Sequence, residues 1–134
     1  MSEAASVGAV ADRERLLAAN GPEPVRVETP EWPGGHVYVR AVTPAEQDAF
    51  ELENSRRLES GEPVNLRARY AVLVVCDAKG RPVFRPSDAD ALGRSPCLRA
   101  VERVVRAARR LNSLDEDDVR EAEKISGPTP PAGS

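Results

Sequence analysis

Apolar and polar residues alternate in two short runs near the start of the chain. The runs cover residues 25–27 and 37–39, and the segment between them contains Pro30, Trp32, Pro33 and two glycines. A period of two is typical of a strand with one buried face, and Pro and Gly favour a loop. The pattern predicts a β-hairpin.

A helix start signal follows the hairpin. The Thr43 side chain can cap a helix, Pro44 suits the first position because no N–H is needed there, and Glu46 completes a capping box. The predicted helix runs to about Leu58. Its sparse apolar residues form one narrow stripe: Ala45, Ala49, Phe50 and Leu52.

The densest apolar run of the chain spans residues 70–76 and follows Asn65, a residue that can cap a helix. The valines of the run suit a buried strand, whereas the preceding residues 66–69 are helical in character. Periodicity alone leaves both interpretations open. The length of the segment favours a central buried helix over residues 66–76.

Three further helix patterns follow. A cap signal predicts a brief helix over residues 87–93. Residues 95–112 show helical spacing without a break, with apolar residues at Leu98, Val101, Val104, Val105, Ala108 and Leu111. Acidic residues in a first turn predict a last helix over residues 113–125.

The two ends of the chain lack the pattern of a packed domain. A short helical pattern that stops at an Asn-Gly-Pro sequence predicts a flexible arm over residues 1–22, and the Pro-rich residues 127–134 predict a disordered tail or linker. A chain of 134 residues suits one domain, which we expect over residues 23–126. The expected fold class is α+β, a mostly helical single domain with a β-hairpin in its N-terminal half.

Composition and charge narrow the possible functions. Aromatic residues make up 4% of the chain, so any core must be built from Val, Leu and Ala. A net charge of −3 gives no overall attraction for nucleic acid or an anionic membrane. The chain shows neither a signal peptide nor an apolar run long enough to span a membrane, so we expect a cytoplasmic protein.

Candidate metal and catalytic groups are few. Cys76 and Cys97 lack metal-site spacing and are expected to be buried free thiols, and the lone His36 is expected to be a turn residue. The acidic residues 115–118 lack the ligand spacing of a calcium loop. Motifs for a nucleophile, a zinc protease or a phosphate loop are absent. We therefore expect no enzymatic activity, no metal and no cofactor.

Arginines recur at spacings of four, three and four on one face of the predicted helix over residues 95–112: Arg99, Arg103, Arg106 and Arg110. Such a strip could bind phosphates. The alternative is a solvated face, partly paired with Glu102 or with the acidic residues 115–118. This alternative is favoured because aromatic stacking partners are missing.

The hairpin offers two other candidate partner contacts. Trp32 can either plug the hairpin onto the core or project as an anchor for a partner. The strand residues Val37, Tyr38 and Val39 can offer a strand edge to a neighbouring subunit, which would support self-association.

Several phrases occur in a fixed order between about residues 25 and 125. They read VYVRAVTPAEQDAFE at residues 37–51, LRARYAVLVVCD at residues 66–77, VF at residues 83–84 and LNSLDEDDV at residues 111–119. In their order and combination they resemble the tail assembly chaperones of siphophages. Members of that family share a β-hairpin near the start, a Thr-Pro-Ala-Glu-like start of the first main helix and a closing helix pair.

The resemblance implies a protein made in the infected or lysogenic bacterial cell that coats the tape-measure protein, keeps it soluble and helps recruit tail-tube subunits. It also implies a longer product of a programmed ribosomal frameshift that contacts the tube subunit, and absence from the mature virion. Because the tape-measure protein is a long helical molecule with apolar stripes, we expect helix-in-groove contacts repeated along it.

The main alternative is a small helical nucleic-acid-binding or regulatory protein that uses the arginine strip on a phosphate backbone. The net charge of −3 and the lack of a helix-turn-helix pattern argue against it. A third option, an adaptor or toxin-neutralising protein, differs only in its partner.

Overall fold

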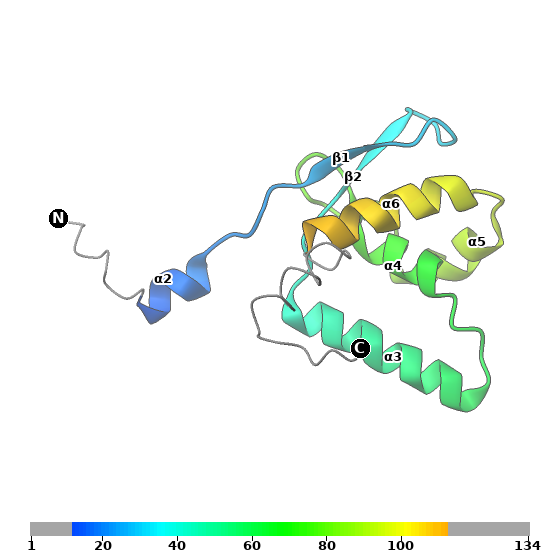
Figure 1. Ribbon diagram of the computed structural model, residues 1–134, viewed down its shortest axis with the longest axis horizontal. Coiled ribbons are helices and arrows are strands. Elements are labelled where there is room, and N and C mark those ends of the chain that lie inside the picture. The colour runs from blue at the N-terminus through cyan, green and yellow to red at the C-terminus, as the bar shows by residue number, and fades with distance from the viewer. Residues whose placement is uncertain (1–11, 113–134) are drawn as a thin grey trace, which may run out of the picture.

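The computed structural model describes residues 12–112, which form the predicted α+β fold, with a small antiparallel sheet beside helices (Figure 1). The predicted helix over residues 113–125 and the tail over residues 127–134 lie outside the described residues. In chain order the elements are α2 (Arg13–Ala18), β1 (Val25–Glu28), β2 (His36–Val39), α3 (Pro44–Ser60), α4 (Leu66–Val74), β3 (Val75–Cys76), the 3₁₀ turn η1 (Pro86–Asp88), α5 (Ala89–Arg94) and α6 (Leu98–Leu111).

The predicted hairpin is confirmed and supplies two of the three strands. β1 and β2 pair antiparallel, with Val25 opposite Val39. The loop closes through a hydrogen bond from the Thr29 N–H to the Gly35 carbonyl at 2.9 Å. Gly34 and Gly35 have φ values of 87° and 78°, a region that residues with a Cβ rarely adopt. β3 pairs with the other edge of β2, which is therefore the middle strand.

The predicted capping box at the start of α3 is confirmed. The Thr43 hydroxyl accepts a hydrogen bond from the Glu46 N–H at 3.0 Å, and the Glu46 carboxylate accepts one from the Thr43 N–H at 2.9 Å. The helix ends at Ser60, slightly beyond the predicted end. There Gly61 adopts a φ of 79° and donates to the Arg57 carbonyl, which closes the last turn.

No residue of α3 is buried, and its solvent face carries a cluster of ion pairs. The Glu53 carboxylate lies 2.7 Å from Arg56 and 2.8 Å from Arg57, and Arg56 also reaches Glu62 at 3.0 Å. Hydrogen bonds from Arg56 and then Arg57 lower the pKa of Glu53 to about 2. Because exposed ion pairs contribute little to stability, the position of α3 depends on its few contacts with the rest of the domain.

The ambiguous run after Asn65 contains both of the elements considered for it, the helix α4 followed by the strand β3. The prediction of a helix through Cys76 is wrong for the last two residues, because they pair with Tyr38 and Val39 of β2. Asn65 does not cap α4 with its side chain either. Its backbone adopts a φ of 52°, and its amide donates to the Ala89 carbonyl at 3.0 Å.

The two later helices form with shifted ends. The brief helix is η1 followed by α5, and Gly93 lies inside α5 instead of ending it. α6 begins at Leu98 and not at Ser95. The Ser95 N–H donates to the Leu92 carbonyl at 3.1 Å and so ends α5, which leaves Cys97 at the N-cap position of α6.

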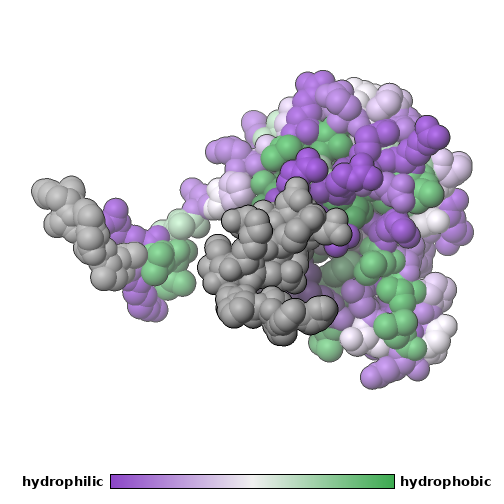
Figure 2. Space-filling model, in the orientation of Figure 1, coloured by the Kyte–Doolittle hydropathy of each residue, from purple (hydrophilic) through white to green (hydrophobic). Residues whose placement is uncertain are grey.

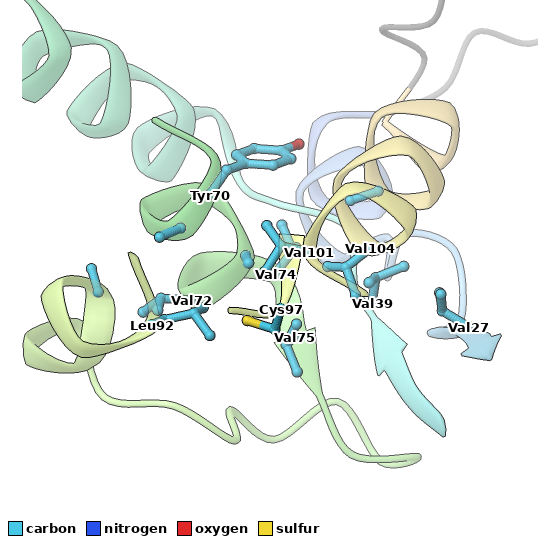
Figure 3. Close-up of a cluster of buried hydrophobic side chains, with 14 residues drawn as sticks. Val27, Val39, Tyr70, Val72, Val74, Val75, Leu92, Cys97, Val101 and Val104 are labelled. Atoms are coloured by element: carbon cyan, nitrogen blue, oxygen red, sulfur yellow. The ribbon is translucent and has the colours of Figure 1, made fainter. Parts of the chain in front are cut away.

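Valines and alanines build the core, as the low aromatic content predicts. Val39, Val74, Val75 and Val104 are fully buried, and Figure 3 shows them gathered from β2, α4, β3 and α6. α6 packs against α4 and against both strands of the hairpin. Full burial of each such valine stabilises the fold by roughly 1.5–3 kcal/mol, so these contacts hold α4, α6 and the sheet together.

The two cysteines are buried free thiols, as predicted. Cys76 is 1% exposed and Cys97 is 7% exposed. Burial raises the pKa of the Cys76 thiol, which disfavours the reactive thiolate. Cys76 therefore behaves as a small apolar core residue.

α2 stands clear of the rest of the molecule, joined to β1 by an extended segment (Figure 1). Asp12 caps it by accepting a hydrogen bond from the Arg15 N–H at 2.9 Å. Leu16 and Leu17 are 64% and 72% exposed, and no residue of the helix is buried. α2 therefore presents an apolar patch to solvent (Figure 2).

Candidate partner-binding groove

Phe50 and Arg69 fasten α3 to α4. The Phe50 ring meets the Tyr70 ring edge-on with 5.3 Å between centroids, and the Arg69 guanidinium lies 4.6 Å from the Phe50 centroid. Arg69 also donates to the Phe50 carbonyl at 3.2 Å and to the Asn54 side chain. Burial lowers the pKa of Arg69, but arginine titrates so far above neutrality that the guanidinium stays charged.

Two more contacts fix the start of α3. Arg40 makes two hydrogen bonds to the Glu46 carboxylate, at 3.0 and 2.9 Å, and these lower the pKa of Glu46. The Asn112 side-chain oxygen accepts a hydrogen bond from the Val42 N–H at 3.0 Å, while its amide donates to the Ala108 carbonyl at 2.9 Å. α3 is thus attached at its start and at its middle.

An open hollow lies between α3, α4 and α6, with a volume of about 340 Å³. We name it the three-helix groove. Its walls are formed by Gln47, Phe50, Leu66, Arg67, Tyr70, Val105 and Arg109. Leu66 is 49% exposed, so apolar surface in this groove is open to a partner. A second hollow of about 330 Å³ also borders Phe50, but the paired groups Arg40, Glu46 and Arg69 line it.

Two buried polar atoms in the wall of the three-helix groove lack a hydrogen-bond partner among residues 12–112. They are the Tyr70 hydroxyl and the Gln47 side-chain oxygen, although the Gln47 amide donates to Glu51 at 2.8 Å. Burial raises the pKa of Tyr70, so its hydroxyl is neutral. A hydrogen-bonding contribution from the Asn112 side chain acts in the opposite direction on that pKa, although no Asn112 atom meets the geometry of a hydrogen bond with the hydroxyl. A buried unpaired polar atom costs about 1–3 kcal/mol of stability.

Two arginines flank the groove from different helices. Arg67 of α4 has a 63% exposed side chain and makes one long ion pair, with Glu102 at 3.6 Å. Arg109 of α6 is exposed. An exposed pair at this distance contributes little, so both guanidinium groups can bind a carboxylate. The groove combines apolar walls, unpaired polar atoms and cationic flanks.

The fold divides the predicted arginine strip. Arg103 donates to the Glu28 carbonyl at 3.1 Å and forms an ion pair with Glu31. The hydrogen bond from Arg103 lowers the pKa of the Glu31 carboxyl group. Arg103 therefore fastens α6 to the hairpin loop instead of facing a phosphate backbone.

The rest of the strip faces solvent: Arg99, Arg106 and Arg110 are exposed. The suggested pairing of the strip with Glu102 is wrong, because the cation that pairs with Glu102 is Arg67 on α4. The suggested pairing with the acidic residues 115–118 lies outside the described residues. Phosphate binding by this face stays a prediction.

Trp32 is partly buried and packs against the core, with its ring edge-on to Phe84 at 6.3 Å between centroids. Of its two suggested roles, these contacts correspond to the plug of the hairpin onto the core. A role for Trp32 as an anchor for a partner stays a prediction.

The candidate strand residues Val37, Tyr38 and Val39 lie on β2, the middle strand of the sheet. Val39 is fully buried, and the other two residues are partly buried. β1 is the hairpin strand at the edge of the sheet, so a strand from a neighbouring subunit would add to β1. Contact of these three residues with a partner stays a prediction.

Neither a metal centre nor a membrane span is found in residues 12–112. His36 is the first residue of β2, opposite Glu28, so the prediction of a turn residue is wrong, and its ring lies edge-on to the Tyr38 ring at 5.8 Å between centroids. No group of three His, Cys, Asp or Glu side chains in this part of the chain could hold a metal ion, and none of its helices is long and apolar enough to cross a bilayer.

Sequence reasoning did not identify the three-helix groove. Its walls come from three helices that are separated along the chain, whereas periodicity assigns faces to one helix at a time. One usable signal was present. Phe50 and Tyr70 belong to the few aromatic residues of a chain that is 4% aromatic, and each lies in an element predicted to be helical.

The chain matches no family model, no curated protein and no solved structure in comparisons with known proteins. Function is therefore inferred from the sequence phrases and from the three-helix groove.

Proposed function

We propose that this chain is a bacteriophage tail assembly chaperone, which binds and solubilises the tape-measure protein and helps recruit tail-tube subunits during tail morphogenesis. The sequence phrases at residues 37–51, 66–77 and 111–119 support this family assignment. The structural observation that supports it best is the three-helix groove, a site suited to binding a helix.

A tape-measure protein has to stay soluble before a tail forms around it. A long helix with apolar stripes aggregates unless those stripes are covered. A small domain with an apolar groove covers one short stretch of such a helix, and many copies along the target cover the whole. The chain acts without chemistry of its own, in the cytoplasm of the bacterial host, and is absent from the finished virion.

We further propose, from the family resemblance, that a longer frameshifted product containing this sequence recruits the tail-tube protein. In that product the domain described here would hold the tape-measure protein while the added region contacts the tube subunit. The short form would then provide most of the coat, and the long form would provide the link to the tube.

Co-expression with the tape-measure protein of the same genome tests the proposal. The measurement is the amount of soluble tape-measure protein after affinity capture of this chain and sizing at moderate salt. We expect the tape-measure protein to become soluble and to co-elute with several copies of this chain. An insoluble and unbound tape-measure protein would contradict the proposal.

The same material tests the nucleic-acid alternative, for which the exposed Arg99 and Arg106 are the supporting observation. Retention of DNA with a steep salt dependence, lost when both arginines are changed to glutamate, would favour that alternative. For the chaperone we expect this double variant to solubilise the tape-measure protein as well as the wild-type chain does.

A further inference from the structure

We propose that the acidic residues 115–118 of this chain dock on the arginine strip of α6, at Arg99 and Arg106, and keep the strip from binding nucleic acid. The contact is made within one chain and does not involve the tape-measure protein. It therefore stands or falls independently of the proposed function.

Two members of the arginine strip have no carboxylate partner among residues 12–112. Arg99 and Arg106 are exposed, and no ion pair in this part of the chain involves either of them. Their spacing of seven residues corresponds to about two helical turns, so both lie on the same side of α6. Cations on one exposed helix face without nearby carboxylates attract an anion.

The carboxylates closest to the strip are engaged with other arginines. Glu31 forms an ion pair with Arg103, and a hydrogen bond from Arg103 lowers the pKa of Glu31, with a smaller contribution from the charge of Arg99. Glu102 lies on α6 between Arg99 and Arg106, but its carboxylate lies 3.6 Å from Arg67 of α4. A partner that neutralises the strip must therefore come from outside residues 12–112.

The sequence that follows α6 has the complementary charge. Residues 113–126 contain six acidic and two basic side chains, a net charge of −4, whereas the whole chain has a net charge of −3. The rest of the chain is therefore net positive. Four of the six acidic residues are consecutive, at residues 115–118, and carboxylates and guanidinium groups form the stronger class of hydrogen bonds.

The acidic residues are within reach of the strip. Asp115 is three residues beyond Asn112, a span of at most about 10 Å, and Arg106 lies about 9 Å before Asn112 along the helix axis. Asp118 is six residues beyond Asn112, at most about 20 Å, and Arg99 lies about 20 Å before it. The chain is thus long enough to lay its four carboxylates along the strip.

A tethered acidic segment can exclude nucleic acid from the strip. Joining two groups by a short linker gives an effective concentration on the order of millimolar. Non-specific binding of nucleic acid is weak at physiological salt, with a Kd of about 10⁻⁴–10⁻⁶ M, and would depend on the same guanidinium charges. Residues 115–118 therefore compete with a phosphate backbone for Arg99 and Arg106.

Two full-length variants of equal net charge test the exclusion. The segment variant neutralises residues 115–118, with Asn for each Asp and Gln for Glu. The control variant neutralises four exposed carboxylates that form no ion pair within residues 12–112. Its substitutions are Glu14→Gln, Glu23→Gln, Glu59→Gln and Asp90→Asn.

The probe is a DNA duplex of random sequence. We expect the segment variant to bind it at least about fivefold more tightly than the control variant, a factor at the low end of couplings between two sites. The gain should vanish when Arg99→Gln and Arg106→Gln are added. Equal affinities of the segment and control variants would mean that only net charge matters, and a gain that survives loss of both arginines would place the effect elsewhere. Either result overturns the inference.

Zero-length cross-linking tests the contact without nucleic acid. Arg106→Lys supplies an amine that a carbodiimide can join to a neighbouring carboxylate, and Arg94→Lys, at the exposed end of α5, is the control. Mass spectrometry of the monomer should find position 106 joined to residues 115–118 and should find no such link from position 94. Absence of the link from position 106, or links that form only between two chains, would overturn docking within the chain.

Discussion

The Asn112 side chain accepts a hydrogen bond from the backbone N–H of Val42 at 3.0 Å, across 70 positions of sequence. This contact joins the end of α6 to the segment that leads into α3. The same side chain donates to the Ala108 carbonyl at 2.9 Å, which fixes its orientation. One amide therefore links two walls of the three-helix groove at the end where α3 begins.

Asn112→Ala should loosen that end of the groove. The change leaves the Val42 N–H without its acceptor, and we expect the free energy of unfolding to fall by about 1–2 kcal/mol. Amide hydrogen exchange at the start of α3 should accelerate more than exchange in α4. Asn20→Ala, at an exposed position, is the control and should leave both measurements unchanged. Equal exchange rates in Asn112→Ala and the wild type would contradict this role of Asn112.

Phe50→Ala should release the middle of α3. Truncation removes the contact with the Tyr70 ring and the surface on which the Arg69 guanidinium lies. Truncation of a fully buried phenylalanine to alanine lowers the free energy of unfolding by about 3–5 kcal/mol. Phe50 is only partly buried, so we expect a loss of about 2 kcal/mol, measured by urea unfolding. Leu52→Ala, two residues further and 72% exposed, should cost less than about 0.5 kcal/mol. Similar losses in the two variants would mean that Phe50 does not fasten the helix.

The hairpin and the start of α3 could be predicted because short-range chemistry determines them. Thr43, Pro44 and Glu46 form a helix start within four residues, and the glycines of the hairpin loop permit its turn. The end of α4 could not be predicted in this way. Val75 and Cys76 become a strand because β2 lies beside them, and that neighbour is distant in the sequence.

The hydrogen-bond and ion-pair partners of polar side chains were predicted less well for the same reason. Asn65 has the side chain of a helix cap, but its amide bonds instead to Ala89 of α5. Glu102, one of the two suggested partners of the arginine strip, forms an ion pair with Arg67 of α4. In each case a residue from another helix competes with the local partner, and only the tertiary arrangement decides between them.

Arg103→Ala and Arg106→Ala should separate structural from exposed arginines in the strip on α6. Arg103 donates to the Glu28 carbonyl at 3.1 Å, and loss of this hydrogen bond should lower the free energy of unfolding by about 1 kcal/mol. Exposed Arg106 should be replaceable within about 0.5 kcal/mol. Thermal unfolding of the two variants side by side makes the comparison. A larger loss for Arg106→Ala than for Arg103→Ala would contradict the assignment of Arg103 to the hairpin.

The Arg40–Glu46 pair should give the domain a component of stability that is lost in acid. Two hydrogen bonds from Arg40 hold the pKa of Glu46 below its unfolded value of about 4.3. A carboxylate with a lowered pKa in the folded state contributes stability fully above the unfolded pKa, and the contribution disappears as pH falls through the folded pKa. Glu46→Gln should therefore be less stable than the wild type at neutral pH, and the difference should shrink below about pH 4.

Urea unfolding of both chains between neutral pH and pH 3 measures this difference in stability. Glu59→Gln, at an exposed position on the same helix, is the control and should follow the wild type throughout. A gap between the Glu46→Gln variant and the wild type that stays constant over this range would mean that the ionised form of Glu46 is not what stabilises the start of α3.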